Sequence, residues 1–534
     1  MNNSAIKILF FFFILIIFAN TAHTQIKREW VRSYKIPGSG VTPDDMALDS
    51  SGNIYVCGFG NNGIITIKYS PSGNKIWERL YTSGEPIAVQ PVKMAIDLQK
   101  NIYIIGHTLN WHLVKYDSSG NFQWRSRYSG PGPGSSYPRD MVLDTIGNIY
   151  ITGFSGGIGT FLDITTAKYN PQGDTVWTRR FDYDNYNDDG IKILLNNDNH
   201  IYVFGHMNFS TTSIRRNLVL LKYSISGEQI FDKYVSVPEN YFDYPIDMKN
   251  DKEGNILLLC NRNLPRTITM LYKYNILGDT LWNYFYSGYN NNAYPSKVTT
   301  DSVNNIYIIG GNINDSNRSE LYINKLFPNG SIDFEKNYGI LGKGIGCTDA
   351  LISNNKILYT GSIGSSSPIS NSKFISLESD LAAKIKWYET FDNGNLVTNF
   401  GAIRILSFDN SFYVFGSGTG NIDSNFTLFL IKYNLLSNIN NGSEIVKEFK
   451  LHQNYPNPFN PITNIEFRIT KYGFVTLNIY DITGKLIETL INKNLSPGSY
   501  KIQWDAGNKP TGIYFYSMLS DNKPIDTKRM ILIK

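Results

Sequence analysis

A ten-residue phrase recurs eight times along the chain, at intervals of roughly fifty residues. Its clearest copies are DSSGNIYVCG (Asp49 to Gly58), DTIGNIYITG (Asp144 to Gly153) and DSVNNIYIIG (Asp301 to Gly310). The copies number the repeat units one to eight, and they end at Gly58, Gly106, Gly153, Gly205, Cys260, Gly310, Gly361 and Gly416. A period of this length indicates supersecondary units that stack on one another. It excludes one irregular domain.

Each unit contains three further β-rich runs besides the phrase. In unit one these are a short inner run (Met46 to Leu48), a run ending in Lys-Tyr (Ile67 to Tyr69) and an aromatic run (Trp77 to Tyr81). A turn with glycine, SPSGN, separates the last two, since glycine readily adopts the positive φ that such turns need. Four antiparallel strands in every unit predict an all-β propeller.

The two ends of the repeat array complement each other. Unit eight has its first three runs, which end at Tyr433, but no aromatic run follows them. The segment from Trp30 to Tyr34 resembles Trp77 to Tyr81 and lies as far before it as Trp77 lies before Trp124. We therefore expect the N-terminal strand to complete the last of eight blades and to close the ring. Closure removes an exposed sheet edge that would otherwise invite aggregation.

From about Trp30 to Tyr433 the chain resembles the bacterial SBBP-type propeller repeat, whose units carry a D-x-x-G-N-x-Y-[VI]-x-G phrase. The resemblance implies a β-propeller, here expected to occupy residues 28–434. The family name implies seven blades, and this chain departs from it, because the phrase occurs eight times.

Alignment of the inner runs brings one charged residue from each unit to the same position, and its sign alternates along the chain. Such a ring closes without a like-charge clash only when the number of blades is even, so eight fits. We predict that these residues face the central channel and pair with their neighbours; the alternative is that they are exposed strand ends whose signs alternate by chance. The eight residues are Asp45, Lys93, Asp140, Lys192, Asp247, Lys297, Asp349 and Arg404.

The loops that follow each phrase and precede each inner run vary widely, whereas the turns at the other end of the strands are short and uniform. Variable loops on a rigid scaffold are where recognition usually occurs. Their aromatic and amide side chains suit stacking on sugars and hydrogen bonding to hydroxyl groups, so glycan binding is one hypothesis and ordinary loop composition is the other. The aromatic residues are Trp111, Tyr137, Tyr186, Phe209, Tyr241, Tyr244 and Tyr294.

Signals of catalysis are weak. His107 and His206 share the position after the repeat glycine, but in units that are not adjacent. The acidic pairs Asp44-Asp45 and Asp188-Asp189 suit calcium binding or acid–base chemistry. The alternative is that they are solvated charges in loops or at strand ends. No H-E-x-x-H motif or paired-cysteine motif occurs in the sequence. No cofactor, catalytic residue or metal ligand is therefore assigned.

The balance of charge is small for a chain of 534 residues, since 50 Lys and Arg face 45 Asp and Glu, and no dense basic run occurs. Nucleic acid is not an expected partner. The three cysteines, Cys57, Cys260 and Cys347, lie in different units. Cys57 and Cys260 would stand on nearly opposite sides of a ring, too far apart for a disulfide, so we expect buried apolar roles for both.

The N-terminus opens with Lys7 and an unbroken apolar stretch from Ile8 to Ala19. This stretch is short for a membrane span and suits the apolar region of a secretory signal. We predict a signal peptide over residues 1–24, with an uncleaved anchor as the alternative. No transmembrane span is expected after its removal.

An Asn- and Ser-rich linker is expected over residues 435–448, followed by a different β-domain over residues 449–534. Its predicted strands are Ile465 to Ile469, Val475 to Tyr480, Lys485 to Ile491, Gly498 to Trp504, Gly512 to Ser520 and Thr527 to Ile533. Six or seven short strands at this spacing favour a small Ig-like β-sandwich.

The module carries a short motif in Asn454, Tyr455, Pro456, Asn457, Pro458, Gly484, Gly512 and Lys534. With these residues it resembles the type A C-terminal sorting domain of the bacterial type IX secretion system. The resemblance implies export across both membranes of a Gram-negative bacterium, the type IX machinery as a partner, and a secreted or cell-surface location. The alternative is an adhesive sandwich unconnected with sorting.

The sequence thus favours a secreted or cell-surface propeller that recognises glycan or protein on its variable-loop face. A polysaccharide hydrolase or lyase with a site in the central funnel is an alternative from a different class. A structural component of the surface layer is a third. Acidic or His side chains that converge at the axis on the variable-loop face would favour the enzyme.

Overall fold

A computed structural model describes residues 26–208, 216–235, 242–263, 267–288, 292–314, 318–340, 343–365, 370–392, 400–419, 425–435, 450–469, 473–495, 498–520 and 523–534. Within these ranges the chain forms β-strands and turns and contains no helix. Two compact units can be separated, one inside His23–Ser437 and one inside Asn438–Lys534. The expected signal peptide lies outside the described residues.

The repeat units are built from strands in the order inner strand, phrase strand, Lys-Tyr strand and aromatic strand. Units one to four contain β2 (Val41–Leu48), β3 (Ile54–Gly60), β4 (Gly63–Tyr69), β5 (Lys75–Tyr81), β6 (Gln90–Ile96), β7 (Ile102–His107), β8 (Trp111–Tyr116), β9 (Phe122–Tyr128), β10 (Tyr137–Leu143), β11 (Ile149–Gly156), β12 (Leu162–Tyr169), β13 (Thr175–Phe181), β14 (Asp188–Leu195), β15 (His200–Asn208), β16 (Arg216–Ser224) and β17 (Gln229–Val235).

The remaining units repeat the same order. They contain β18 (Phe242–Asn250), β19 (Ile256–Asn263), β20 (Ile268–Tyr274), β21 (Thr280–Tyr286), β22 (Ala293–Thr300), β23 (Ile306–Ile313), β24 (Ser319–Leu326), β25 (Ile332–Tyr338), β26 (Gly344–Ser353), β27 (Lys356–Ser365), β28 (Ser370–Asp380), β29 (Ile385–Phe391), β30 (Phe400–Phe408), β31 (Ser411–Thr419), β32 (Phe426–Asn434) and, from the N-terminal side, β1 (Lys27–Tyr34).

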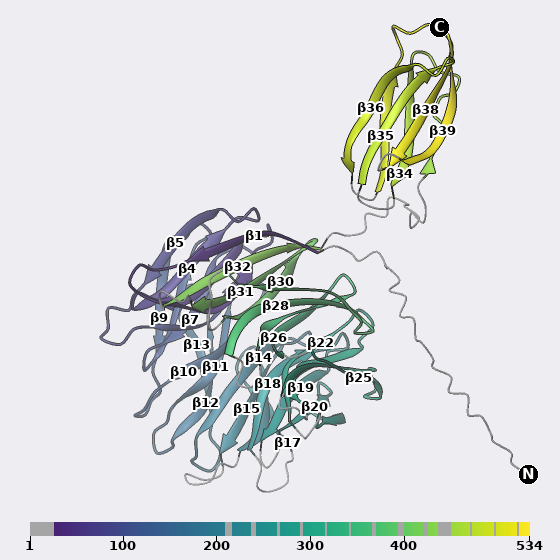
Figure 1. Ribbon diagram of the computed structural model, residues 1–534. Helices are drawn as coiled ribbons and strands as arrows, with labels where there is room; N and C mark the ends of the chain where they lie inside the picture. Colours follow the sequence, from purple (N-terminus) through teal and green to yellow (C-terminus); the bar gives the residue numbers. More distant parts are fainter. Residues whose placement is uncertain are drawn as a thin grey trace, which may run out of the picture. The chain divides into compact units, whose positions relative to one another are not determined.

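Neighbouring strands of each unit pair antiparallel, which confirms the predicted four-stranded sheets and is consistent with a propeller. The sheets of units four and five are joined by a single parallel pairing between Arg216 and Phe242. In unit eight the sheet order is β1-β32-β31-β30, so the fourth strand comes from the N-terminal side of the chain. Figure 1 shows β1 lying beside β32.

Hydrophobic clusters lie between the sheets of consecutive units, which explains why the phrase strands read as continuous apolar runs rather than as an alternation. Ile54, Tyr55, Val56 and Cys57 are all buried because both faces of the sheet are covered. One cluster contains Tyr55 and Trp77 of unit one with Ile104 of unit two. Another contains Tyr413 of unit eight with Val41 and Ile54 of unit one.

The residue that ends each phrase, which is glycine in every unit except unit five, faces a bulge in the inner strand. In unit three the register shifts between Pro138 and Asp140, and a Cβ added to Gly153 would lie 2.1 Å from the carbonyl oxygen of Tyr137. A side chain there would collide with backbone, so the two strands approach closely only because this residue is glycine. The glycine and the bulge together set the position of the next inner-strand residue.

The Asp at the head of the phrase caps its own turn. Asp49 Oδ1 accepts hydrogen bonds from the backbone N–H groups of Ser51 and Asn53 at 2.8 and 3.0 Å. The Tyr55 hydroxyl donates to its Oδ2 at 3.1 Å. Asp144 makes the same set of contacts in unit three. These aspartates are therefore structural.

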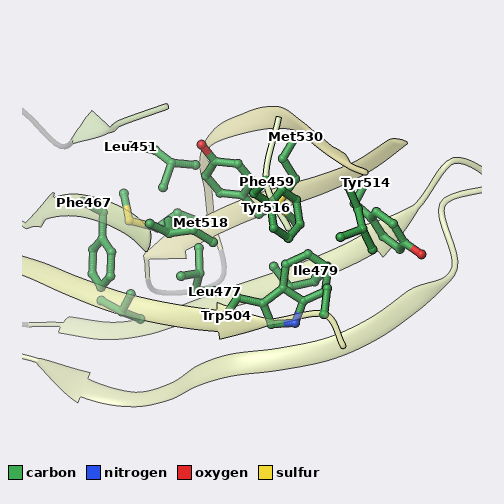
Figure 2. Packing of buried hydrophobic residues seen from close by; sticks show 14 of the residues in the cluster. Leu451, Phe459, Phe467, Leu477, Ile479, Trp504, Tyr514, Tyr516, Met518 and Met530 are labelled. Atoms are coloured by element: carbon green, nitrogen blue, oxygen red, sulfur yellow. The ribbon is translucent and has the colours of Figure 1, made fainter. Parts of the chain in front are cut away.

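The C-terminal module contains β33 (Lys450–Leu451), β34 (Ile462–Ile469), β35 (Gly473–Asp481), β36 (Leu486–Leu495), β37 (Gly498–Asp505), β38 (Gly512–Ser520) and β39 (Lys523–Leu532). They form two small sheets, β33-β34-β37 and β36-β35-β38-β39. One core holds Phe467 and Trp504 of the first sheet with Ile479 and Tyr516 of the second. Figure 2 shows how closely these side chains pack.

Candidate functional site

The eight charged residues aligned from the sequence occupy one register position. Each follows the bulge of its inner strand and pairs with the residue before the last residue of the phrase: Asp45 with Cys57, Lys93 with Ile105, Asp140 with Thr152, Lys192 with Phe204, Asp247 with Leu259, Lys297 with Ile309, Asp349 with Thr360 and Arg404 with Phe415. We call these residues the charge series.

Members of the charge series from successive units approach one another. Lys93 Nζ lies 3.8 Å from Asp45 Oδ2 and 3.9 Å from Asp140 Oδ1. Lys297 Nζ lies 3.4 Å from Asp247 Oδ2 and 3.8 Å from Asp349 Oδ1. Lys192, the member between Asp140 and Asp247, has no ion pair with any described residue.

Arg404 joins unit eight to unit one. Its Nε donates to Asp45 Oδ1 at 2.6 Å, and its Nη1 lies 3.8 Å from Asp349 Oδ2. Burial alone would raise the pKa of Asp45, but Lys93 and Arg404 lower it below its ordinary value. Asp45 is therefore a buried, ionised carboxylate held by two cations.

Each aspartate of the charge series also binds the backbone of the following unit. Asp45 Oδ2 accepts from the N–H of Met94 at 2.9 Å, and Asp349 Oδ2 accepts from the N–H of Ile405 at 3.1 Å. Asp140 and Asp247 accept equivalent bonds from units four and six. These contacts fix the register between units, which is a structural role.

At the variable-loop end of each unit, one residue of the inner strand pairs with one residue of the phrase strand, and we call the two a loop-end pair. The inner-strand residue stands three positions before the member of the charge series. The phrase-strand residue directly follows the last residue of the phrase. In units two to five these loop-end pairs are bulky or polar, and in units seven and eight they are Gly and Ser. The pairs of units one to eight are Thr42–Phe59, Gln90–His107, Tyr137–Phe154, Asp189–His206, Tyr244–Asn261, Tyr294–Gly311, Gly346–Ser362 and Gly401–Ser417.

Arg139 links the loop-end pairs of units three and four. Its Nε and Nη2 donate to Asp189 Oδ2 at 3.0 and 2.8 Å, and its guanidinium lies over the Phe154 ring, 5.3 Å from the centroid. The Tyr137 and His107 rings are 4.2 Å apart between centroids. Side chains of units two, three and four therefore meet here.

Arg216 and Tyr244 extend this group to unit five. The Arg216 guanidinium lies 4.3 Å from the Phe242 ring centroid and 6.0 Å from that of Tyr244. The His206 ring lies 5.4 Å from Tyr244 between centroids. We name Tyr137, Arg139, Asp189, His206, Arg216 and Tyr244 the Arg139 cluster.

Burial and charge set the protonation of the cluster. Burial lowers the pKa of His206 to about 3, and the positive charges of Arg216 and Arg139 contribute to the shift. Burial also lowers the pKa of His107, with a further contribution from Arg139. Both imidazoles are therefore neutral at neutral pH. Burial raises the pKa of Asp189, a shift that Arg139 opposes.

The structure corrects two readings of the loop residues. Trp111, which the sequence placed among the aromatic residues of the variable loops, is buried and donates its Nε1–H to the carbonyl oxygen of Phe154 at 3.3 Å. Asp45, Asp188 and Asp189 are buried rather than solvated, because each has hydrogen-bond partners inside the fold. Phe209 and Tyr241 lie outside the described residues.

Sequence reasoning missed Arg139 and Arg216. It noted His107 and His206 but treated them as unrelated, because they belong to nonadjacent units. A signal was available: Tyr137, Asp189 and Tyr244 all stand three residues before a member of the charge series.

Among the described residues no group of three or more His, Cys, Asp or Glu is arranged to hold a metal ion. The three cysteines are free thiols, and Cys57 and Cys260 are buried.

A cavity of about 410 Å³ lies away from the Arg139 cluster, between the outer strand of unit one and the turn before β9. It is lined by Arg79, Leu80, Tyr81, Thr82, Tyr116, Gly120, Asn121 and Phe122. The Tyr81 and Phe122 rings stack beside it. Tyr116 ends β8, and Gly120 lies in the short turn before β9, which is of the kind that recurs between units. This cavity therefore follows from the packing of one unit against the next.

The sorting residues hold the opening loop of the C-terminal module in place. Asn454 is buried, and its Nδ2 donates to Thr463 Oγ1 at 2.9 Å. Asn457 Oδ1 accepts from the N–H of Ile531 at 2.9 Å. Between them the side chain of Tyr455 is 81% exposed, with Pro456 and Pro458 on either side of Asn457.

The other sorting residues stand at turns and strand ends. Gly484 has a φ of 81° in the turn after β35, a conformation that favours glycine. Gly512 is the first residue of β38. The backbone N–H of Lys534 donates to Thr511 Oγ1 at 3.3 Å.

Residues 453–534 match the family described as secretion system C-terminal sorting domain. This module indicates secretion to the cell surface or exterior of a Gram-negative bacterium through the type IX system, and it implies contact with that machinery. No helix in the described part of the chain is long and apolar enough to cross a membrane. A comparison with curated proteins gives no match.

Solved structures with similar arrangements of sheets include propeller-like proteins. An ulvan lyase of polysaccharide lyase family PL25 is 11% identical, over 62% of this chain and 93% of that one, with a TM-score of 0.41. A puromycin hydrolase is 10% identical, over 71% and 59%, with a TM-score of 0.43. Drosophila Plexin A in complex with Semaphorin 1b is 11% identical, over 63% and 86%, with a TM-score of 0.39.

Proposed function

We propose that this exported protein is a recognition propeller that binds glycan at the Arg139 cluster. The observation that carries the proposal is the uneven distribution of the loop-end pairs. Units two to five contribute Tyr137, Tyr244, His107 and His206, whereas units seven and eight contribute Gly and Ser. Aromatic rings beside hydrogen-bonding groups suit a sugar, whose faces stack and whose hydroxyl groups bind polar atoms.

The proposed scaffold is a closed ring of eight SBBP-type blades over residues 28–434. Closure is supported by the pairing of β1 with β32, by the apolar cluster shared by units eight and one, and by the bond from Arg404 to Asp45. The alternating charge series fits an even number of blades. A signal peptide over residues 1–24, a linker over 435–448 and an Ig-like sorting sandwich over 449–534 complete the proposed organisation.

A glycan array probed with the full-length mature protein tests the recognition. We expect binding to at least one polysaccharide, weakened by Tyr137→Ala or Tyr244→Ala, because each removes an aromatic face from the cluster. Tyr388→Ala is the matched control, since this tyrosine is 56% exposed on the outer strand β29. Absence of binding to every polysaccharide would count against the proposal and would favour a structural component of the surface layer.

A polysaccharide lyase is a second candidate, and the pairing of neutral histidines with tyrosines beside arginines favours it over a hydrolase. A lyase removes the proton next to a uronate carboxylate and breaks the C–O bond to the next sugar, which leaves a C=C bond. Neutral imidazole can take that proton, a tyrosine hydroxyl can donate a proton to the leaving oxygen, and a guanidinium can neutralise the carboxylate. Glycoside hydrolysis usually needs two carboxyl groups, and Asp189 is bound to Arg139.

The two candidates differ in their products. Prolonged incubation with a polyuronate should leave its chain length unchanged if the protein only binds. A rise in ultraviolet absorbance from unsaturated chain ends would show that the protein acts as a lyase and not only as a recognition protein. Reducing ends without that absorbance would indicate a hydrolase instead.

The sorting function has its own test. Deletion of residues 449–534 should trap the propeller in the periplasm, because the type IX machinery recognises the removed module. Fractionation of cells that express the full and truncated chains measures this. Normal surface display of the truncated protein would refute the assignment of the sorting role.

A further inference from the structure

Positive charge exceeds negative charge in the Arg139 cluster. Arg139 uses Nε and Nη2 on Asp189 Oδ2, while its side chain is 41% exposed. A guanidinium carries five N–H donors, so two bonds to one carboxylate oxygen do not exhaust it. Asp189 is only 8% exposed and is bound to this one arginine.

Arg216 adds a second guanidinium without a second carboxylate. Its Nε donates to Asn208 Oδ1 at 3.1 Å, and it has no ion pair with any described residue. Arginine keeps its charge at any physiological pH. Phe242 lies against the guanidinium at 4.3 Å and shields part of it from water.

The histidines do not alter this balance. His206 is 4% exposed, and its Nδ1 has no hydrogen-bond partner. It lies close enough to both arginines for their charges to act on it. Since His206 is neutral, two arginines and one aspartate leave the cluster with an excess of one positive charge. A partly shielded excess charge beside two tyrosines is complementary to an anion attached to an apolar ring.

We infer that the Arg139 cluster selects anionic polysaccharide, with Arg216 and the free donors of Arg139 on a carboxylate or sulfate group and Tyr137 and Tyr244 on the sugar rings. This inference rests on the proposed glycan recognition and names its substrate class. Carboxylate and sulfate share the charge and the acceptor oxygens that a guanidinium binds.

Calorimetry on the full-length mature protein with four polymers tests the selection. Polygalacturonate is compared with its methyl ester, which keeps the backbone and loses the charge, and dextran sulfate is compared with dextran. We expect at least one charged polymer to bind on the order of tenfold more tightly than its neutral partner, the effect of one charge-assisted contact. Added salt should reduce that difference. The preferred polymer distinguishes carboxylate from sulfate.

Arg216→Gln should lower the affinity for the preferred charged polymer on the order of tenfold, and it should lower the affinity for the neutral partner by less. This variant removes no ion-pair partner from any described carboxylate, and a thermal melt confirms that it folds. Arg125→Gln on β9 changes the net charge equally at an exposed site and should have no such effect. Equal affinity for charged and neutral polymers, or equal losses in the two variants, would overturn the inference and leave glycan recognition standing. Failure to bind any of the four, with an array that is also negative, would overturn both.

Discussion

At the scale of single residues, a glycine in the turn before the aromatic strand of each of units one to six lies against an aromatic ring of the preceding unit, and Ala383 takes its place in unit seven. A Cβ at Gly120 would lie 2.8 Å from the ring of Trp77, and one at Gly173 would lie 2.8 Å from the ring of Trp124. Both glycines also have a φ between 80° and 90°. Two independent requirements, a left-handed backbone and an absent side chain, therefore fall on the same residue.

Gly120→Ala should destabilise the propeller more than Gly84→Ala does. Both glycines have positive φ, 80° and 75°, but nothing lies within 4 Å of a Cβ at Gly84. Gly84→Ala should cost about 1 kcal/mol for the backbone alone, and Gly120→Ala should add roughly 1–3 kcal/mol for the collision with Trp77. Urea denaturation of the two variants measures the difference. Equal losses would show that the Trp77 ring moves aside without cost.

Asp188 should make the stability of the propeller fall as pH rises. Burial raises its pKa from 3.8 to about 8, and nearby Asp182 and Asp163 raise it further, while the N–H groups of Tyr183 and Asn208 oppose the shift. The folded state therefore holds a proton that the unfolded state releases. This contribution to the free energy of unfolding is fully present below about pH 4. It is lost as pH rises to about 8, with a slope approaching 1.4 kcal/mol per pH unit.

Asp188→Asn should remove this slope, because an amide resembles the protonated carboxyl group and does not titrate. The variant should gain stability relative to the native protein as pH rises from about 4 to about 8. Thermal melts over that range measure the gain. A constant difference between the two proteins at every pH would show that Asp188 does not hold its proton.

At the scale of elements, the strands could be predicted because each is encoded locally. Turn residues separate the repeat phrase, the Lys-Tyr run and the aromatic run. The order of the strands can therefore be predicted from a single unit, and the other units repeat it. The resemblance of Trp30–Tyr34 to other aromatic runs was enough to predict a fourth strand for unit eight, and β1 pairs with β32.

The candidate site could not be predicted in the same way, because its contacts join units. Arg139 and Asp189 stand fifty residues apart and meet only through the packing of units three and four. Trp111 looked like a loop residue, yet it begins β8 and is buried against unit three. The bulge before each member of the charge series does leave a mark in the sequence: a proline stands two residues before the member in units one, two, three, five and six.

Trp30→Ala should loosen unit eight as a whole. Trp30 is 8% exposed, lies 6.1 Å from the Tyr413 ring between centroids, and contacts the turn of unit one at Gly73. Its loss should cost about 3–5 kcal/mol and free β1 from β32. Hydrogen exchange should then increase in β30, β31 and β32.

The equivalent tryptophan of unit three provides the control. Trp177 is 7% exposed and contacts Gly227 of unit four. Trp177→Ala should cost a similar amount, but its increase in exchange should fall in units three and four. An increase in β30–β32 of the same size in both variants would mean that β1 has no special part in unit eight.

At the scale of the whole molecule, three kinds of contact connect the ends of the repeat array. Lys432 of unit eight donates to the carbonyl oxygen of Pro71 at 3.1 Å, as Lys68 of unit one does to Ser118. The apolar cluster of Tyr413 and Val41 and the ion pair of Arg404 with Asp45 lie between the same two units. The first and last units thus meet through contacts of the kind that join consecutive units elsewhere.

Arg404→Gln should therefore destabilise the entire propeller, whereas Lys192→Gln at the equivalent register should not. Arg404 compensates two buried carboxylates, Asp45 and Asp349, which are 1% and 6% exposed. Without Arg404, Lys93 is the remaining cation beside Asp45 and Lys297 the remaining cation beside Asp349. The loss of this buried pair should cost about 3 kcal/mol. Lys192 has no ion pair with a described residue, so its loss should stay within about 0.5 kcal/mol. Denaturation in urea compares the two variants. Equal effects would mean that the charge series adds nothing to the contact between units eight and one. A loss confined to Arg404→Gln would locate part of the stability of the repeat array at that contact.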